Sequence, residues 1–347
     1  MNWDHLELDQ RVVSAVRRAK LKSVREVLCF SGPDLQRLTG LSRSDVQQLL
    51  TAVLFCVFSA LLLYHGECRR LESGLRLGVG CPVLNELLRG GLPVGGVTEL
   101  SGESGAGKTQ LALQLCLSVQ YPTEHKGLNS GAVYISTEDS FPIRRLQQLI
   151  REQSSLRSDV PPSLISSLQF SDHIYIEHAA DLESLQVCLS RRVPLLLARG
   201  LVRLVVVDSV AALFRSEFQA ADWLERNKQL IAFSSTLHHL SQEFTTPVLC
   251  INQFSSRHCM GQGQAPGPGD TWIYSCSPLS SNVSPALGLA WANQVMVRLM
   301  MWRLQETVVR GDQSSVLRKL EVVFAPHLAR DSRDTAVWRE GVQGVYA

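Results

Sequence analysis

Hydrophobic and polar positions follow two different patterns along this chain, and the change comes near residue 75. Before that point, apolar residues recur at helical spacing, as in residues 10–20 and 23–30. After it, short runs of apolar and β-branched residues alternate with helical stretches, which is typical of a parallel sheet covered by helices. The pattern predicts a small all-α domain followed by an α/β core.

The first 50 residues are predicted to contain an element like a helix-hairpin-helix. Gly40 allows a tight turn after one short helix, and Ser42 is well placed as the N-cap of the next. A basic cluster lies nearby, formed by Arg17, Arg18, Lys20, Lys22 and Arg25. Either phosphate contacts on DNA or a solvated helix face explains such a cluster, and both remain open.

Residues 51–75 are interpreted as a linker, and residues 76–347 as the core. Residues 51–64 are almost wholly apolar, but these about 14 residues are too few to span a bilayer, which needs roughly 20. We therefore expect no membrane helix. An apolar linker needs a cover, so we expect it either to dock on a neighbouring protomer or to pack on its own domain.

A phosphate-binding loop dominates the core. It is the G-x-x-x-x-G-K-[ST] match Gly102-Glu103-Ser104-Gly105-Ala106-Gly107-Lys108-Thr109. A strand is predicted at residues 97–100 and a helix at 110–120, which begins with Gln110, so the motif has the context it requires. The glycines let backbone N–H groups face phosphates, Lys108 reaches the β and γ phosphates, and Thr109 offers its hydroxyl to Mg²⁺. This stretch predicts nucleotide binding, with ATP and Mg²⁺ as cofactors.

Polar residues follow other predicted strands of the core. Residues 133–137 lead to Glu138, and the β-branched run at 204–209 contains Asp208, a Walker B candidate. A strand at 247–251 leads to Asn252 and Gln253, whose amides could sense a terminal phosphate or orient water, or simply cap the strand. Ligands bind at the carboxyl edge of parallel sheets, so we expect these groups near the loop. Further strands are predicted at residues 291–301 and 320–324.

The composition is that of an ordinary globular protein and excludes few classes of function. The 347 residues are 45% hydrophobic and 19% charged, with a formal net charge of +2, so any nucleic-acid binding must be local. The nine cysteines are scattered without C-x-x-C pairs, which indicates neither a zinc site nor a disulfide framework and favours a reducing compartment. The N-terminus lacks the basic start and apolar core of a signal peptide.

Several of these motifs together resemble the eukaryotic RecA-like recombinases. They are the phosphate loop, Thr137-Glu138-Asp139-Ser140-Phe141 with Arg145, Val207-Asp208-Ser209, Ile251-Asn252-Gln253 and the helical N-terminal domain. The resemblance implies a RecA-like P-loop ATPase core with a central, mostly parallel, twisted sheet. It covers nearly the whole chain, and is weakest at residues 51–75 and beyond residue 325.

The resemblance also implies roles for individual residues. Glu138 lies where the family places the carboxylate that activates the attacking water, and Asp208 where it places the Walker B acid that helps hold Mg²⁺. Gln253 matches the γ-phosphate sensor and Arg145 the arginine that stacks on adenine. Pro326 lies in the segment that matches a cap over the nucleotide of the adjacent protomer.

The regions that match the family's DNA loops are poor in positive charge. The first keeps only Arg215, and the second, residues 254–284, offers Arg257 with Trp272 and Tyr274 as stacking groups. Tracking many phosphates of a single strand needs more cations, which argues against a strand-exchange filament. In the linker, Val57 and Ala60 have the spacing of the family's Phe-x-x-Ala polymerisation motif, without its phenylalanine.

The hypothesis that follows is an ATP-binding accessory subunit of homologous-recombination repair, with slow DNA-dependent ATP turnover. We expect it to act with another RecA-like paralogue, with the main recombinase as a second candidate partner, on single-stranded or branched DNA. The alternatives are an autonomous strand-exchange recombinase, another phosphate-loop class such as a hexameric helicase or a small-molecule kinase, and a nucleotide-stabilised scaffold. The resemblance implies a nuclear protein and leaves a cytoplasmic pool open.

Overall fold

The computed structural model describes residues 9–21, 27, 30, 32–50, 53, 74–138, 140–218, 222–253 and 287–345. The chain divides into a helical unit within Met1–Ser73 and a larger unit that begins at Gly74, and each is considered by itself. The division into residues 1–50, 51–75 and 76–347 expected from the sequence remains a prediction.

The N-terminal unit contains the predicted helix, glycine turn and second helix. Helix α3 (Gly32–Thr39) is followed directly by Gly40, whose φ of +68° is the left-handed conformation that glycine adopts readily. Residues 43–50 form the next helix. The Ser42 hydroxyl accepts from the Asp45 backbone N–H at 3.2 Å, and the Asp45 carboxylate accepts from the Ser42 backbone N–H at 3.3 Å. This reciprocal pair is a capping box, so the predicted helix start is confirmed.

A small apolar cluster holds this unit together. Helix α1 (Gln10–Arg18) contributes Val16, α3 contributes Leu35, and the helix at 43–50 contributes Leu49, all three with no measurable exposure. Their packing against one another makes one core from residues spread over this unit. The apolar residues that recur at helical spacing therefore lie on the buried faces of these helices.

The larger unit is built on one sheet. Among the described residues, nine strands form it in the order β11-β10-β9-β8-β3-β7-β6-β4-β5. The strands from β8 to β5 in this order run parallel, whereas β9, β10 and β11 join antiparallel. The strands are β3 (Val97–Gly102), β4 (Gly131–Ser136), β5 (Ile174–His178), β6 (Val202–Asp208), β7 (Val248–Gln253), β8 (Val297–Arg310), β9 (Gln313–Phe324), β10 (Ser332–Val337) and β11 (Val342–Gly344). The predicted mostly parallel α/β sheet is confirmed.

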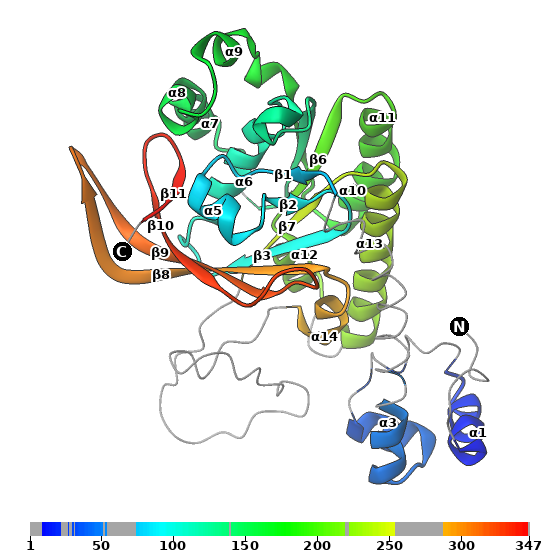
Figure 1. The fold of residues 1–347 in the computed structure, drawn as a ribbon. Coiled ribbons are helices and arrows are strands. Elements are labelled where there is room, and N and C mark those ends of the chain that lie inside the picture. The colour runs from blue at the N-terminus through cyan, green and yellow to red at the C-terminus, as the bar shows by residue number, and fades with distance from the viewer. Residues whose placement is uncertain are drawn as a thin grey trace. The chain divides into compact units, whose positions relative to one another are not determined.

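Helices cover the sheet. Their described members are α5 (Pro82–Leu87), α6 (Lys108–Ser118), α7 (Ile143–Arg151), α8 (Gln153–Leu156), α9 (Pro162–Ser167), α10 (Leu182–Val187), α11 (Val193–Ala198), α12 (Val210–Ser216), α13 (Trp223–Glu243) and α14 (Gly288–Ala292). Three short helical turns, η2 (Thr123–His125), η3 (Phe170–His173) and η4 (Cys188–Arg192), and a small two-stranded sheet of β1 (Arg76–Leu77) and β2 (Leu92–Pro93) complete the unit. Figure 1 shows the long helix α13 and helix α11 alongside the parallel strands.

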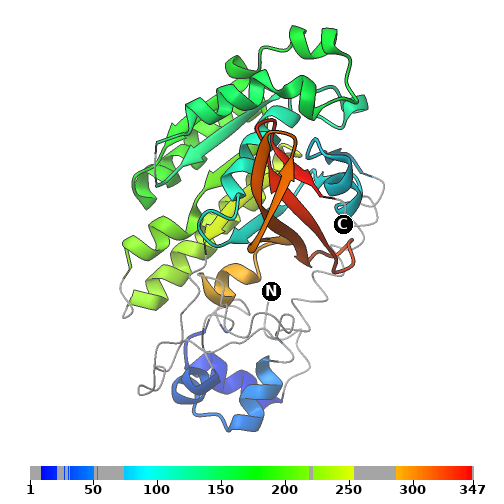
Figure 2. The ribbon, with the colours of Figure 1, turned by 90° about the vertical axis from the view of Figure 1, so that its left-hand side faces the viewer.

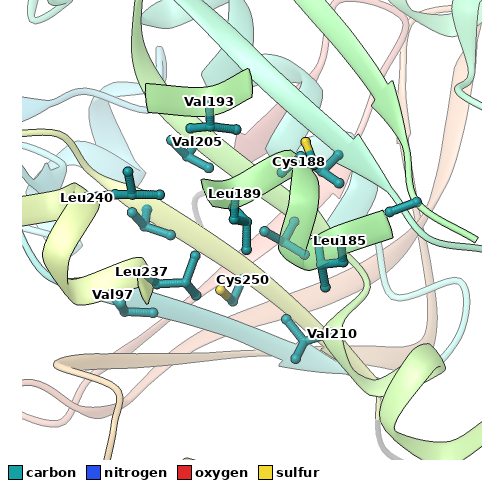
Figure 3. Close-up of a cluster of buried hydrophobic side chains, with 14 of the residues drawn as sticks. Val97, Leu185, Cys188, Leu189, Val193, Val205, Val210, Leu237, Leu240 and Cys250 are labelled. Atoms are coloured by element: carbon teal, nitrogen blue, oxygen red, sulfur yellow. The ribbon is translucent and has the colours of Figure 1, made fainter. Parts of the chain in front are cut away.

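A large core cluster lies between one face of the parallel strands and these helices. Figure 3 shows Val97 of β3, Val205 of β6 and Cys250 of β7 facing Leu189 of η4 and Leu237 of α13. All five side chains are at most 1% exposed. Because parallel strands covered by helices are buried, β4, β6 and β7 appear in the sequence as largely apolar runs, whereas β3 also carries buried polar residues such as Thr98 and Glu99.

The C-terminal strands differ from the sequence prediction. Residues 291–301 were expected as a strand, yet Trp291 lies in helix α14, and β8 begins only at Val297. Leu287, Trp291 and Val295 recur every fourth residue and are all buried, which is a helical spacing inside an apolar run. The expected strand at 320–324 begins earlier, at Gln313, and pairs with β8 across a turn at Gly311, whose φ is +60°.

The β8–β9 hairpin extends well past the strands it joins. Figure 1 shows it, in orange, projecting beyond the rest of the sheet, and Figure 2 shows it with β10 and β11 from that side. Its tip pairs Arg310 with Gln313, and its base pairs Arg298 with Phe324. The hairpin therefore reaches past the end of β3, where the phosphate loop begins.

Candidate nucleotide-binding site

The phosphate loop joins the buried strand β3 to helix α6, as its sequence context predicted. Gly105 and Gly107 have φ of +74° and +104°, which side chains other than glycine rarely tolerate. The Lys108 Nζ donates to the carbonyls of Gly102 and Glu103, each at 2.8 Å, so the lysine folds back over the loop. Burial lowers the pKa of Lys108, and the carboxylates of Asp208, Glu138 and Glu103 oppose that shift. An anion at the loop would compensate this buried cation.

An acidic group lies beside the loop, at the end of β6. The Thr109 hydroxyl donates to Asp208 Oδ2 at 2.8 Å, and the Tyr134 hydroxyl donates to the same oxygen. Burial raises the pKa of Asp208, while these two hydrogen bonds and Lys108 act in the opposite direction. The peptide bond from Asp208 to Ser209 is cis. Threonine hydroxyl and carboxylate oxygen therefore lie together, as a magnesium site in this class requires.

A second carboxylate stands at the end of β4. Glu138 is exposed, and its Oε1 accepts from the Ser209 hydroxyl at 2.8 Å. The Gln253 side-chain amide donates to both Glu138 oxygens, at 3.3 and 3.0 Å. Because Gln253 is the last residue of β7, the amide that holds Glu138 also ends a central strand. The structure thus brings the two predicted residues into direct contact.

Arg145, on the first turn of α7, is held firmly. Its Nε donates to Gln110 at 2.6 Å and its Nη1 donates to Gln148 at 2.5 Å. Its guanidinium also donates to the carbonyls of Trp338 and Arg339, at 2.7 and 2.9 Å. Four acceptors therefore fix the plane of this cation, which suits a group that stacks on a planar ring.

These groups line one hollow of about 830 Å³. The predicted residues on its wall are Ser104, Gly105, Gly107, Lys108, Thr109, Gln110, Glu138, Arg145, Asp208 and Gln253. A nucleoside triphosphate fits a hollow of this size. The site also contains residues that the sequence analysis missed, from the hairpin, from the end of β10 and from the turn after it: Asp312, Gln313, Ser314, Arg318, Val337, Trp338 and Arg339. The Gly311-Asp312 pair, which follows the β-branched run at 307–309, was the available signal for that hairpin.

Several predicted site residues lie outside the wall of the hollow. Asn252 was expected to sense a phosphate, but it is fully buried and donates to Glu99 at 2.7 Å. Successive strand residues point to opposite faces, so only Gln253 of this pair reaches Glu138. Gly102 and Glu103 instead hold Lys108, and Ala106 is fully buried. Pro326, half-buried after β9, remains a prediction for a neighbour's nucleotide.

The predicted DNA contacts are only partly within the described residues. Arg215, at the end of α12, is exposed, and Arg17, Arg18 and Lys20 are exposed at the end of α1. Lys22, Arg257, Trp272, Tyr274, Val57 and Ala60 lie outside the residues that the structure describes. Within the described ranges, no cluster of three or more metal-ligating side chains occurs, and no helix is long and apolar enough to cross a bilayer.

The loop between β3 and α6, with acidic and amide side chains ending the neighbouring parallel strands, defines a RecA-like P-loop nucleotide-binding protein. The Rad51 family model matches residues 70–270, and the chain belongs to this family. A second family model, XRCC3/RpoA-like helix-hairpin-helix domain, matches residues 3–57. The expected RecA-like core with a helical N-terminal domain is thereby confirmed.

Proteins with similar sequences carry names that fit the Rad51 family. The chain is 50% identical to "DNA repair protein XRCC3" of Mus musculus. The alignment has 351 positions, gaps included, and covers 99% of this chain and 98% of that protein. It is 49% identical to the Bos taurus protein of the same name, again over 99% and 98%. It is 31% identical to human "DNA repair protein RAD51 homolog 2", over 85% of this chain and 78% of that protein.

Proposed function

We propose that this chain is an ATP-binding subunit of DNA repair by homologous recombination, which works in a complex with another RecA-like paralogue. One observation carries the proposal: Lys108, Thr109, Asp208, Glu138 and Gln253 meet at one hollow, in a chain of the Rad51 family. The relatives named as DNA repair proteins support the process. Nuclear residence follows from that process, and a cytoplasmic pool stays open.

The residues of the hollow fit ATP with Mg²⁺. Lys108 is a buried cation at the loop, and the Thr109 hydroxyl with the Asp208 carboxylate offers hard oxygen ligands. When bound, Mg²⁺ supplies positive charge to the β- and γ-phosphate oxygens. The fixed Arg145 suits stacking on the adenine ring.

Glu138 is the candidate general base for hydrolysis. It is exposed to the hollow and is oriented by Ser209 and Gln253, so its free lone pairs can accept a proton from water. A γ-phosphate oxygen would compete with Glu138 for the Gln253 amide. That exchange is the proposed signal, because Gln253 directly precedes the segment in which we expect DNA contacts.

We infer slow ATP turnover and an accessory role from the small number of positive charges in the two segments that match the family's DNA loops. The segment after β7 offers a single arginine, Arg257, over residues 254–284, and the segment after β6 offers Arg215. A strand-exchange filament needs many more phosphate contacts. ATP is therefore proposed to set an interface with a partner and DNA, with hydrolysis following slowly.

The test is size-resolved binding of the full chain, alone and with a RecA-like partner, to single-stranded and four-way DNA. We expect tight DNA binding only by a defined heterocomplex with ATP and Mg²⁺, and loss of its ATP dependence in Lys108→Ala. The matched control is Lys126→Ala, which removes a lysine that does not line the hollow. Long filaments formed by the chain alone would favour the autonomous recombinase, and DNA binding indifferent to Lys108→Ala would favour the scaffold.

A further inference from the structure

Two arginines of the β8–β9 hairpin flank the phosphate loop. Arg303 of β8 and Arg318 of β9 are directly paired across the hairpin. A Cβ atom added at Gly107 would lie 3.4 Å from both Cδ and Nε of Arg318, and one added at Gly105 would lie 3.7 Å from Nη1 of Arg303. The two guanidinium groups therefore stand beside the loop glycines whose backbone faces phosphate in this class of site.

Arg318 keeps an unused hydrogen-bond donor at this position. Its Nε is buried and has no hydrogen-bond partner, whereas its Nη1 donates to the Ser315 hydroxyl at 3.2 Å and the Val316 carbonyl at 2.6 Å. The side chain lines the hollow. A guanidinium with a buried, unused N–H is costly unless an acceptor arrives, so this group points to a ligand with acceptor oxygens.

The charge around Arg318 favours an anion. Within the part of the chain that the structure describes, neither Arg303 nor Arg318 forms an ion pair, and the Glu103 carboxylate accepts from the Arg303 backbone N–H at 3.1 Å. Burial, followed by the neighbouring Arg303, lowers the pKa of Arg318. Two adjacent cations in a partly buried place repel one another, and a bound phosphate would relieve that repulsion.

The strand order shows from which side Arg318 reaches the loop. The loop follows β3; Glu138, Asp208 and Gln253 follow or end β4, β6 and β7 on one side of it, and Arg318 comes from β8–β9 on the other. The hairpin tip lines the same hollow as Trp338 and Arg339, whose carbonyls hold Arg145. Arg318 thus lies on the flank opposite Glu138 and Asp208.

We propose that Arg318 binds the α- and β-phosphates of a nucleotide held by its own chain, with Arg303 adding positive charge behind it. The inference rests on the proposed function, because it requires that the hollow takes a nucleotide. Arg318 is a binding residue that contacts ATP and ADP alike, and it does not report the γ-phosphate. The projecting hairpin is thereby a part of the nucleotide site.

The experiment measures dissociation constants of the full-length chain for ATP, ADP and AMP with Mg²⁺, by equilibrium titration. We expect Arg318→Gln to weaken ATP and ADP about equally, by roughly tenfold or more, because a charge-assisted hydrogen bond is lost. AMP, with one phosphate, is expected to lose less. The matched control is Lys319→Gln, which removes the same charge one residue along β9 and does not line the hollow.

Lys108→Ala separates the two proposals. If the wild-type chain binds no nucleotide and Lys108→Ala changes nothing, the proposed function fails. If Lys108→Ala abolishes binding but Arg318→Gln binds ATP and ADP like the wild type, only the role of Arg318 is wrong. A loss confined to ATP would also overturn it, since that would place Arg318 at the γ-phosphate.

Arg318→Lys covers the case in which Arg318→Gln does not fold. Lysine keeps the charge but loses the planar fork and its Nε–H, so we expect ATP and ADP affinity severalfold below that of the wild type. Thermal unfolding without nucleotide checks that the variant is folded. Wild-type affinity of a folded Arg318→Lys variant for both nucleotides would overturn the proposal.

Discussion

His327 is a buried histidine without hydrogen bonds to its ring. It is 6% exposed, and neither ring nitrogen has a partner. Burial, followed by the positive charges of Arg76 and Arg89, lowers the pKa of His327 to about 4. Arg89 also donates to the His327 backbone carbonyl at 3.5 Å. A neutral imidazole is therefore built into the segment directly after β9.

This histidine makes stability depend on pH. The unfolded chain binds a proton near the ordinary histidine pKa of about 6.5, whereas the folded chain binds it only near 4. The unfolded state thus holds more protons between these values, so stability is full above the upper value and falls as pH drops toward the lower. At pH 5 the loss due to His327 is about 2 kcal/mol.

We therefore expect His327→Gln to reduce the acid sensitivity of the fold. Between pH 8 and pH 5, the fall in unfolding free energy should be about 2 kcal/mol smaller than in the wild type. Urea unfolding at both pH values measures it, with the exposed His173→Gln as the control. An equal fall in all three proteins would mean that His327 is accessible to protons in the folded state.

At the scale of elements, one buried carboxylate joins strands and a helix. Glu99 of β3 is fully buried and accepts from Asn252 of β7 at 2.7 Å, from the Trp291 indole of α14 at 2.8 Å and from Arg298 of β8. Arg298 is itself 8% exposed. These contacts tie the end of β7 to α14 and β8, and so join described elements on either side of segment 254–286.

Glu99→Gln is expected to destabilise the α/β unit by about 3 kcal/mol or more, because it leaves Arg298 as an uncompensated buried charge. The control is Glu225→Gln on α13, whose partner Lys228 is 64% exposed at the side chain, and which should cost less than about 1 kcal/mol. Chemical denaturation measures both. Equal small effects would mean that water reaches the Glu99 cluster.

The same elements show what the sequence could predict. The strands β4, β6 and β7 are largely apolar runs that lead to Glu138, Asp208 and Gln253, and the phosphate loop after β3 carries its own motif, so local pattern located these groups. The contact of Asn252 with Glu99 could not be predicted, because the two residues are 153 positions apart in sequence and no local rule reveals such a contact. Arg318 was missed for a similar reason: only the pairing of β8 with β9 brings it to the loop.

At the scale of the whole molecule, a helical unit and an α/β unit share one nearly neutral chain. The formal net charge is +2, so bulk attraction to DNA is weak and any DNA contact depends on local clusters. In the described residues, one such cluster is Arg17, Arg18 and Lys20, all exposed at the end of α1. The helix-hairpin-helix family model matches this unit, over residues 3–57.

We expect this basic cluster to contact DNA phosphates. Replacing Arg17, Arg18 and Lys20 by glutamine should weaken DNA binding by the heterocomplex and lower the slope of log affinity against log salt by about 2 to 3, because each phosphate contact releases counterions. ATP binding should not change. The matched control replaces the exposed Arg144, Arg191 and Arg199 of the α/β unit, which removes the same three charges.

The slope of log affinity against log salt distinguishes a direct phosphate contact from long-range electrostatic attraction. Loss of three surface cations anywhere lowers long-range attraction slightly, and both triple variants share that effect. Only cations that touch phosphate change the number of released counterions, so a slope that falls in the N-terminal variant alone identifies the helical unit as a DNA-binding element. Identical slopes in both variants would instead make the cluster a solvated helix face and leave the α/β unit as the source of DNA contacts.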